Sequence, residues 1–287
     1  MAGNAPVIQY RNEFVLGFAQ RASLLKDTTT KEMMIKGNQA TFLVANTTGA
    51  MVTRGVNGMI AYQDNDNAQV TATLSERHAP YEMTNFNIFT SQGDQRAIMQ
   101  MNSMALVNRD IDNFILAELA NGTLDTGAAA TASLTMIGKA IATLQNGGVP
   151  WDGNVYAVIS ASFLIYLMSI NQFSSADWVN VKPAVNFPGL NATQANSAGQ
   201  GWYEWMGVKW IVSSLITGAG TNSEKCYMYH RSAIGYACDT DNVSVEMDYD
   251  KKQHSSWTRA SLFHGAKMLQ NAGIVQMLHD GSAHVAS

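Results

Sequence analysis

The six histidines are the first residues to consider for chemistry, because imidazole serves both proton transfer and metal binding. They are His78, His230, His254, His264, His279 and His284. Only Cys226 and His230 stand at a possible ligand spacing, four residues apart. That spacing gives a shared face on a helix, whereas the surrounding block KCYMYHRSAIGYACD is typical of strands. The sequence therefore gives no local support for a zinc site.

The acidic residues form no motif of metal binding or acid–base catalysis. The run Asp64-Asn65-Asp66-Asn67 is faintly similar to a calcium loop, but it lacks the following glycine and the distal bidentate acid. We interpret this run as a polar turn at the tip of a loop. Asp110 and Asp112 fall on the polar side of a predicted long helix, where we expect a solvated or intersubunit role.

Other signatures of catalysis are missing from the sequence. Gly138-Lys139 lacks the leading glycine and the following Ser or Thr of a phosphate-binding loop. There is no Gly-x-Ser-x-Gly elbow and no dinucleotide-binding fingerprint. The sequence predicts a protein without a catalytic centre, a cofactor or a metal. An active site assembled from distant residues leaves no such motif, so an enzyme stays open as an alternative.

The composition favours surfaces that other subunits cover. Charged residues make up 14% of the 287 residues, against about a quarter in ordinary soluble proteins. Interface centres are depleted in charge. The net charge of -4 gives no overall attraction to nucleic acid. Cys226 and Cys238 are too few for a disulfide framework, and we expect two buried thiols in a reducing compartment. With no signal pattern or membrane span, we expect an origin in the cytosol.

The N-terminal half predicts a leader, an extended loop and one long helix. Residues 1–36 hold five basic and three acidic residues, with an amphipathic helix at 12–25. A strand at 40–45 precedes an extended two-stranded loop over 47–80. Another strand is expected at 80–89. The helix then covers about 94–121, because its apolar residues recur every three or four positions.

The C-terminal half predicts alternating helices and strands and then long closing strands. After a small-residue linker at 126–133 we expect a helix at 134–146, a strand at 155–160 and a helix at 161–170. Residues 171–201 form a long loop, which usually indicates function or partner contact. Strand-like blocks follow from 207 to 278. Two of them, at 243–250 and 256–278, close the chain.

The order of these parts resembles that of tailed-phage major capsid proteins. The likeness is strongest in SSWTRASLFHGAKMLQNAGIVQML, with its embedded Arg259 and Gly265. It covers nearly the whole chain as an ordered pattern, and it implies the α+β, HK97-like fold that tailed-phage and encapsulin shells share. On this resemblance the chain divides into an N-terminal arm (1–36), a peripheral-domain strand (37–45), an extended β-hairpin loop (46–82), a peripheral domain with a spine helix (83–127), an axial α/β domain (128–242) and closing peripheral strands with the C-terminus (243–287).

The resemblance implies a homo-oligomeric icosahedral shell of hexamers and pentamers around double-stranded DNA. The location would be the virion, after assembly in the host cytoplasm, with portal, scaffolding and cement or decoration proteins as further partners. Candidate intersubunit contacts are Arg54, Asp64, Asp66, Glu76 and Arg77 in the loop and Trp178 and Phe187 near the capsomer axis. Arm residues that could face DNA or a neighbour's spine helix are Arg11, Arg21 and Lys26.

Two departures from the family's pattern qualify this expectation. No lysine lies between Lys36 and Lys139, so the loop has no lysine for the covalent crosslink that some relatives form. We therefore expect non-covalent contacts or a cement protein to stabilise the shell. The chain also has no long charged N-terminal extension of the kind that acts as a fused scaffold, so we expect a separate scaffolding protein.

Two other functions stay open at this point. An encapsulin-like compartment would have the same fold but would enclose protein cargo, and the 12–25 segment is compatible with a cargo groove. An α/β enzyme would use the 171–201 loop as a lid over a pocket, although it would explain the extended 47–80 section poorly.

Overall fold

A computed structural model of the chain describes residues 22–45, 50–56, 58, 60, 62, 67–91, 94–170, 173, 203–240 and 243–284. Most of the helix expected at 12–25 and nearly all of the 171–201 loop lie outside these ranges. So do the candidate residues Arg11, Arg21, Asp64, Asp66, Trp178 and Phe187.

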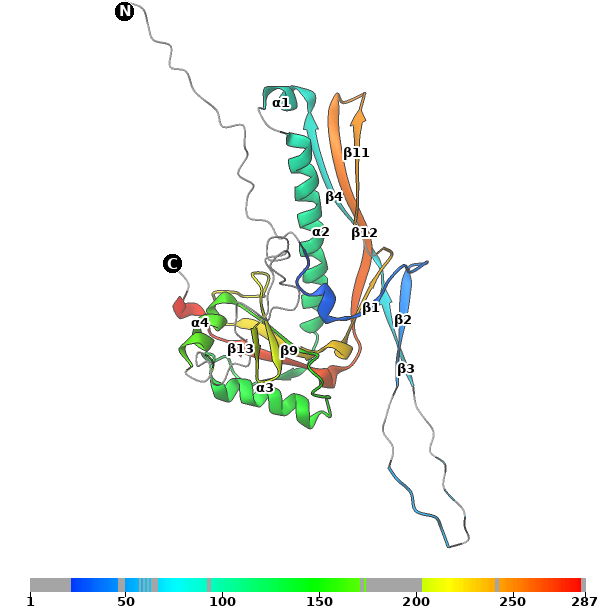
Figure 1. Cartoon of the computed structure of the whole chain (residues 1–287), viewed down its shortest axis with the longest axis vertical. Helices are drawn as coiled ribbons and strands as arrows, with labels where there is room; N and C mark the ends of the chain where they lie inside the picture. Colours follow the sequence, from blue (N-terminus) through cyan, green and yellow to red (C-terminus); the bar gives the residue numbers. More distant parts are fainter. Residues whose placement is uncertain are drawn as a thin grey trace, which may run out of the picture.

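One long strand, β12 (Ser255–Met268), organises a five-stranded sheet in the upper part of Figure 1. β12 runs antiparallel to three partners, β4, β10 and β11. A short strand, β1, adds parallel to β10. Alternate residues of β12, such as Thr258, Ala260 and Leu262, are buried, whereas Arg259 between them is exposed. The partner strands are β1 Thr30–Glu32, β4 Ser75–Thr84, β10 Ile234–Cys238 and β11 Ser244–Asp250.

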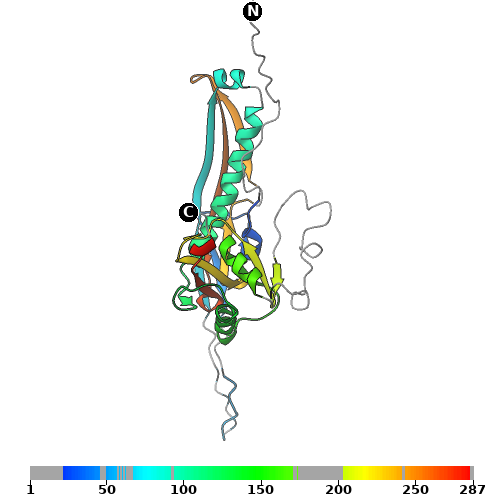
Figure 2. The same ribbon diagram turned by 90° about the vertical axis from the view of Figure 1, so that its left-hand side faces the viewer.

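The helix α2 (Gln95–Leu119) lies along this sheet (Figures 1 and 2) and confirms the helix predicted at about 94–121. It begins after Asp94, whose carboxylate accepts a hydrogen bond from the backbone N–H of Ala97 at 3.2 Å. Its buried apolar residues are Met99, Ala105, Val107, Ile111, Ile115, Leu116 and Leu119. Among the helices in the described ranges, none is long and apolar enough to cross a membrane.

A second, six-stranded sheet forms the lower body, in the order β5-β13-β9-β6-β8-β7. Large side chains that are completely buried, among them Phe163, Trp210 and Tyr227, fill the core around it. Cys226 and Cys238 are buried free thiols, as predicted. The strands are β5 Leu124–Asp125, β6 Val155–Ile159, β7 Tyr203–Trp205, β8 Val208–Val212, β9 Glu224–His230 and β13 Ile274–His279.

Two helices pack with this sheet, α3 (Leu134–Asn146) and α4 (Ala161–Ser169). Both confirm predicted helices, and β6 confirms the strand predicted at 155–160. Each helix begins where a serine side chain accepts a backbone hydrogen bond, Ser133 for α3 and Ser160 for α4. Four 3-10 turns complete the described chain, η1 Lys26–Thr28, η2 Arg231–Ala233, η3 Asn271–Gly273 and η4 Ser282–His284.

The third feature is a hairpin that projects from the body (Figure 1). Its strands β2 (Gln39–Val44) and β3 (Ala68–Thr73) pair antiparallel with each other in a separate two-stranded sheet. Residues 39–73 are called the hairpin from here on. The strand expected at 40–45 is β2, but it belongs to the hairpin and not to the long sheet. Residues 75–82, expected in the extended loop, instead form most of β4 in the long sheet.

The strand predicted at 80–89 is wrong beyond Thr84. There β4 gives way to a short helix, α1 (Asn85–Thr90). The register explains the change, because Thr84 pairs with Ser255, the first residue of β12, and the partner strand extends no further. The hydroxyl of Thr84 then accepts a hydrogen bond from the backbone N–H of Asn87 at 3.4 Å and caps the helix.

The single long strand predicted at 256–278 is wrong as well. β12 ends at Met268, and β13 begins at Ile274 in the six-stranded sheet, so the chain crosses from one sheet to the other between them. The backbone N–H groups of Leu269 and Gln270 both donate to the carbonyl of Ala233, at 2.8 and 3.3 Å. The amide side chain of Asn271 bonds the N–H and the hydroxyl of Thr123 at 2.9 and 2.8 Å.

Candidate functional site

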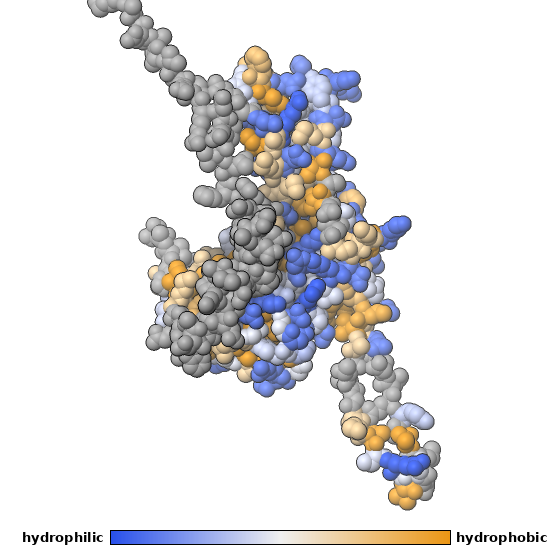
Figure 3. Space-filling view, viewed as in Figure 1, coloured by the Kyte–Doolittle hydropathy of each residue, from blue (hydrophilic) through white to orange (hydrophobic). Residues whose placement is uncertain are grey.

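The hairpin exposes apolar side chains that the described part of its own chain does not cover. Met51, Val56 and Tyr62 are 103%, 106% and 97% exposed. In Figure 3 hydrophobic residues appear at the far end of the molecule, beyond the body. Arg54, a candidate contact, donates from Nε to the carbonyl of Gly58 at 3.1 Å. An exposed apolar group of this kind indicates an interaction surface.

A second apolar surface lies at the opposite end of the long sheet. Phe86 and Phe89 of α1, called the aromatic tip here, are 73% and 85% exposed. α1 lies at the top of Figure 1, whereas the hairpin projects from the right-hand side of the body towards the bottom of the view. The molecule therefore presents large apolar side chains at both ends of its long axis. Because NFNIF is predicted as a strand from the sequence, this tip was not among the expected contacts.

A charged cluster joins β4, α2 and β12. The carboxylate Oδ2 of Asp110 lies 3.1 Å from Nε2 of His264 and 3.4 Å from Nε of Arg77. The Arg77 guanidinium also stands 4.9 Å from the ring centroid of Phe114. Burial lowers the pKa of His264, and the bond to Asp110 opposes that effect. Asp110, expected to be solvated or intersubunit, binds two residues of its own chain.

A cavity of about 310 Å³ opens beside this cluster, between β4 and α2. Arg109 lines it and has no ion pair with any residue in the described ranges. Glu76, another candidate contact, bonds Nε2 of His78 at 2.9 Å. The lining residues are Arg77, His78, Ala79, Leu106, Val107, Arg109, Asp110 and Asn113.

The described chain is anchored near its start by a buried carboxylate. Asp112 in α2 is completely buried and accepts hydrogen bonds from the Ser23 hydroxyl at 2.5 Å and from the N–H groups of Leu24 and Leu25 at 3.0 and 3.1 Å. The N–H of Lys26 donates to the Ser23 hydroxyl at 3.0 Å. The expectation that Asp112 is solvated or intersubunit is therefore wrong. Asp112 lies three residues before Ile115 and four before Leu116, on the buried stripe of α2, and this spacing was the sequence signal for its burial.

A second fixation point follows directly in the same segment. The hydroxyl of Thr28 lies 2.5 Å from that of Tyr229 in β9, and both side chains are buried. Arg231 donates from Nε to the carbonyl of Thr29 at 3.1 Å. The segment that leads away from the N-terminal residues is therefore attached both to the long helix and to the lower body.

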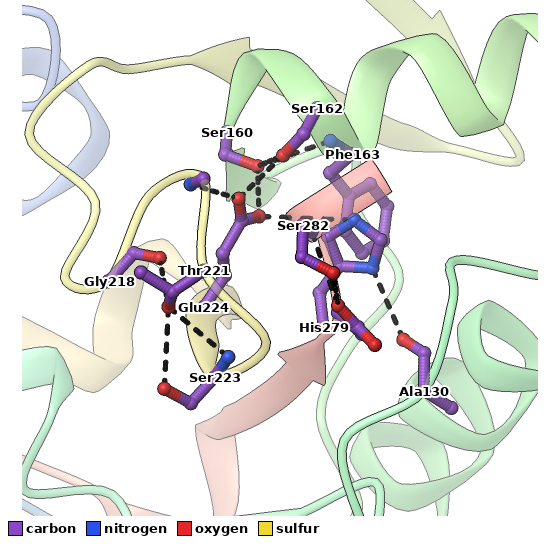
Figure 4. A network of polar contacts seen from close by, with 12 residues as sticks. Ala130, Ser160, Ser162, Phe163, Gly218, Thr221, Ser223, Glu224, His279 and Ser282 are labelled. Carbon is purple, nitrogen blue, oxygen red and sulfur yellow. Dashed lines mark hydrogen bonds and ion pairs between the residues drawn. The ribbon is translucent and has the colours of Figure 1, made fainter. Parts of the chain in front are cut away.

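The lower body contains a buried polar network around Glu224 (Figure 4). Its carboxylate accepts hydrogen bonds from the Ser160 hydroxyl, from the Ser162 hydroxyl at 2.6 Å and from the N–H of Gly220 at 2.5 Å. Nε2 of His279 lies 3.9 Å from the same carboxylate, and its Nδ1 donates to the carbonyl of Ala130 at 3.2 Å.

Serine, histidine and glutamate meet here, yet their order is not that of a nucleophile and its base. Ser160 donates to Glu224, and its hydroxyl caps α4. Glu224 and His279 are completely buried, so a substrate has no access to them. Within the described part of the chain, no three His, Cys, Asp or Glu side chains gather as a metal site would require. The network joins β9, α4 and the end of β13.

These features define a structural subunit that offers apolar surfaces at its ends to other molecules. The chain belongs to the phage capsid protein family, because the family model described as Phage capsid protein matches residues 3–281. The protein is therefore a structural component of the virion capsid. No match was found among curated protein sequences.

Solved structures with the same fold come from several phages and from a GTA particle. One from Mycobacterium phage Che8 has a TM-score of 0.74 and 17% identity and covers 96% of this chain and 98% of its own. The capsid of Ralstonia phage GP4 has a TM-score of 0.72 and 10% identity, and the match covers 99% of this chain and 98% of that one. The capsid of a native GTA particle has a TM-score of 0.69 and 14% identity, and the match covers 96% of this chain and 95% of that one. The α+β, HK97-like fold predicted from the sequence is confirmed. Neither the encapsulin nor the enzyme alternative gains support.

Proposed function

We propose that this chain assembles as hexamers and pentamers into an icosahedral shell around double-stranded DNA, and that it does so without catalysing a reaction. The exposed apolar side chains of the hairpin are the observation that carries the proposal. Met51, Val56 and Tyr62 have no cover from the described part of their own chain. Apolar surface is stable when it is removed from water, and in the proposed shell a neighbouring subunit covers it.

The parts of the chain take different roles in this shell. Residues 1–36 form an arm whose Arg11, Arg21 and Lys26 face DNA or a neighbour's long helix. The hairpin crosses a neighbouring subunit, and the lower body, with Trp178 and Phe187, lies near the capsomer axis. Assembly takes place in the host cytoplasm with scaffolding and portal proteins. With no lysine available for a crosslink between residues 37 and 138, non-covalent contacts or a cement protein stabilise the shell.

Negative-stain electron microscopy and size-exclusion chromatography of the purified chain test this assembly. The chain is expressed alone and together with a candidate scaffolding protein. We expect regular shells or free hexamers and pentamers in at least one preparation. Enclosed DNA after packaging supports the proposed content, whereas protein cargo contradicts it. A monomer or dimer in both preparations would overturn the proposal.

A charge introduced into the hairpin tests how much the hairpin contributes to shell assembly. Val56→Glu places a carboxylate in the apolar contact and is expected to abolish shells, because burying an unpaired charge is costly. The unassembled subunit should unfold as the wild type does, since Val56 is fully exposed there. Val56→Met keeps an apolar side chain and serves as the control that retains assembly. Normal shells from Val56→Glu would exclude the hairpin from the interface.

Among the candidate charges, Asp64 and Asp66 are proposed to meet the cavity beside Arg77 and Arg109 of a neighbouring copy. Arg109, which has no ion pair within the described residues, supplies the complementary charge. Arg54 in the hairpin and Glu76 in β4 contribute further charges. A charge exchange tests this pairing. Arg109→Glu alone and Asp64→Lys with Asp66→Lys should each lower shell yield, and the combined variant should recover it. If the combination is no better than either parent, the charges do not meet.

A further inference from the structure

The hairpin approaches the long sheet closely at Gly235 of β10. The ring of Phe42 in β2 lies over this glycine. A methyl group added at Gly235 would lie 2.8 Å from Cζ, 2.9 Å from Cε2 and 3.1 Å from Cδ2 of the ring. Carbon atoms in favourable contact are about 3.5 to 4.0 Å apart. Only glycine, which has no side chain, allows the Phe42 ring to lie this close to the backbone of β10.

A second close approach lies at Gly265 of β12, opposite Thr73 at the end of β3. A methyl group on Gly265 would lie 2.3 Å from the carbonyl oxygen of Thr73 and 3.1 Å from its carbonyl carbon. Both are backbone atoms, so no side-chain rotation relieves the overlap. Each strand of the hairpin therefore rests on one glycine of the sheet.

A small apolar cluster fills the space around these two contacts. Its buried residues form a group apart from the main core, and we call it the root cluster. Phe42 is 5% exposed, so its ring has little free space to turn into. The root cluster consists of Ala40, Phe42, Ala72 and Ala237, with Ile35, Leu74 and Leu269 packed against it.

The backbone at the root is equally constrained. Leu74 is the single residue between β3 and β4, so the second strand of the hairpin continues into the long sheet without a loop. The N–H of Leu74 donates to the carbonyl of Asn38 at 2.9 Å and closes the base of the hairpin. The direction of the hairpin therefore depends on how closely β2 and β3 lie against the sheet.

We propose that Gly235 and Gly265 are positioning residues that set the angle at which the hairpin leaves the body. Because they have no side chains, the two glycines allow the base of the hairpin to lie directly against the sheet. The hairpin then points in a direction in which its far end reaches the neighbouring subunit. A small displacement at the root is magnified along the projecting strands. This inference rests on the proposed function, because the angle affects assembly only if the hairpin bridges two copies.

The test combines Gly235→Ala with a compensating change in the ring above it. Gly235→Ala is expected to lower shell yield at least about tenfold, because added volume in a filled contact displaces its neighbours. Phe42→Leu in the same chain removes the overlapping ring atoms and should restore most of the yield. Gly138→Ala is the matched control, since a methyl group there has no neighbour within 4 Å. It should assemble like the wild type.

A distance measurement separates the hairpin angle from assembly itself. Spin labels at Leu43→Cys on β2 and Lys251→Cys in the turn before β12 report the angle in the unassembled subunit, because Leu43 and Lys251 are exposed. Gly235→Ala should shift their distance distribution, and adding Phe42→Leu should reverse the shift. Gly265→Ala should also shift it, but Phe42→Leu should not reverse that change, because the overlap involves backbone.

The outcomes distinguish this inference from the proposal on which it rests. An unchanged label distance in Gly235→Ala, or no reversal by Phe42→Leu, overturns the positioning role whether or not shells form. A shifted distance with normal shell yield also overturns the role in assembly. If the wild type forms no shells but the distances behave as expected, the proposed function fails while the geometry of the root stands.

Discussion

At the scale of single residues, buried polar side chains do most to define how the parts of the molecule are joined. Asp112 ties the start of the described chain to the long helix, and Glu224 ties three segments of the lower body together. Both carboxylates are completely buried and both accept several hydrogen bonds. A buried charge is tolerated only when it is bonded in this way, so each fixes a unique arrangement of its donors.

Removing the Asp112 carboxylate should loosen the anchor of the N-terminal segment. Asp112→Ala leaves two backbone N–H groups and one hydroxyl without their acceptor, so we expect a loss of about 2 to 4 kcal/mol in the free energy of unfolding. Urea denaturation of the unassembled subunit measures it. Arg109→Gln, an exposed change on the same helix, should stay within about 0.5 kcal/mol. Equal effects of the two variants would contradict the anchoring role.

His264 should make stability depend on pH. Burial holds its pKa in the folded state below the ordinary value of about 6.5. The unfolded chain then binds the proton more readily, so the histidine's contribution is intact above about pH 6.5 and is lost as the pH falls towards the folded pKa. His264→Phe removes this titration and keeps a ring between Phe114 and Tyr236.

Denaturation curves between pH 8 and pH 5 check this prediction. The wild type should lose more stability than His264→Phe over that range, although the variant starts lower because Asp110 loses a partner. Besides burial, the charges of Asp110, Arg77 and Asp239 act on the pKa of this histidine. Parallel pH profiles for the two proteins would show that His264 does not titrate differently on folding.

At the scale of elements, the three longer described helices were predictable from the sequence to within a few residues, because a stripe of apolar residues and a cap are local signals. α2, α3 and α4 follow such stripes. The strands were less predictable, since a strand ends where its partner ends. Residues 80–89 and 256–278 looked like single strands because apolar residues continue past Thr84 and Met268. β4 ends where its partner β12 begins, at Ser255, and the chain leaves β12 where Leu269 and Gln270 donate to the carbonyl of Ala233. Both Ser255 and Ala233 are distant in sequence from the strand ends that they determine.

The candidate contacts illustrate the same limit. Arg77 was expected to contact another subunit, but the structure places it beside Asp110 and Phe114 of its own chain. These residues are distant from Arg77 in sequence, so no local pattern relates them to it. The root cluster gave no sequence signal either, because nothing local relates Phe42 to Gly235. Family resemblance, by contrast, was readable from the order of elements, since that order does not depend on the individual pairings.

The crossing between the two sheets supplies a prediction about an element boundary. Asn271 accepts from the N–H of Thr123 and donates to its hydroxyl. Asn271→Ala removes both bonds and should lower the free energy of unfolding by about 1 to 2 kcal/mol. Asn271→Asp still accepts from the N–H, and the Thr123 hydroxyl can turn to donate, so it should stay close to the wild type. Thermal or urea denaturation distinguishes the two variants.

At the scale of the whole molecule, apolar surface is concentrated at two distant ends, and the aromatic tip is the one that sequence analysis overlooked. Its two phenylalanines account for little of the subunit's own stability because both are largely exposed. Exposed aromatic residues of this kind are typical anchors of interfaces. We therefore expect the tip to contribute to contacts between subunits in the shell.

Replacing the tip should separate assembly from folding. Phe86→Ser with Phe89→Ser is expected to leave the unfolding of the subunit within about 0.5 kcal/mol of the wild type and to reduce shell yield. Light scattering during assembly and electron microscopy measure the yield. Phe86→Leu with Phe89→Leu keeps apolar side chains and should assemble better than the serine pair. Identical yields from both pairs would remove the tip from the interface.

The crossing after β12 also bears on how the chain folds as it leaves the ribosome. β13 is inserted between β5 and β9, inside the six-stranded sheet, and it is the last strand of the described chain. β9 therefore has an unpaired edge until residues 274–279 have been synthesised, and the pairing of β5 with β13 spans about half of the sequence. Such distant pairings form slowly. A chain that stops before residue 274 would keep an open strand edge in its lower body, so we expect a subunit to become competent to join others only after β13 has been made.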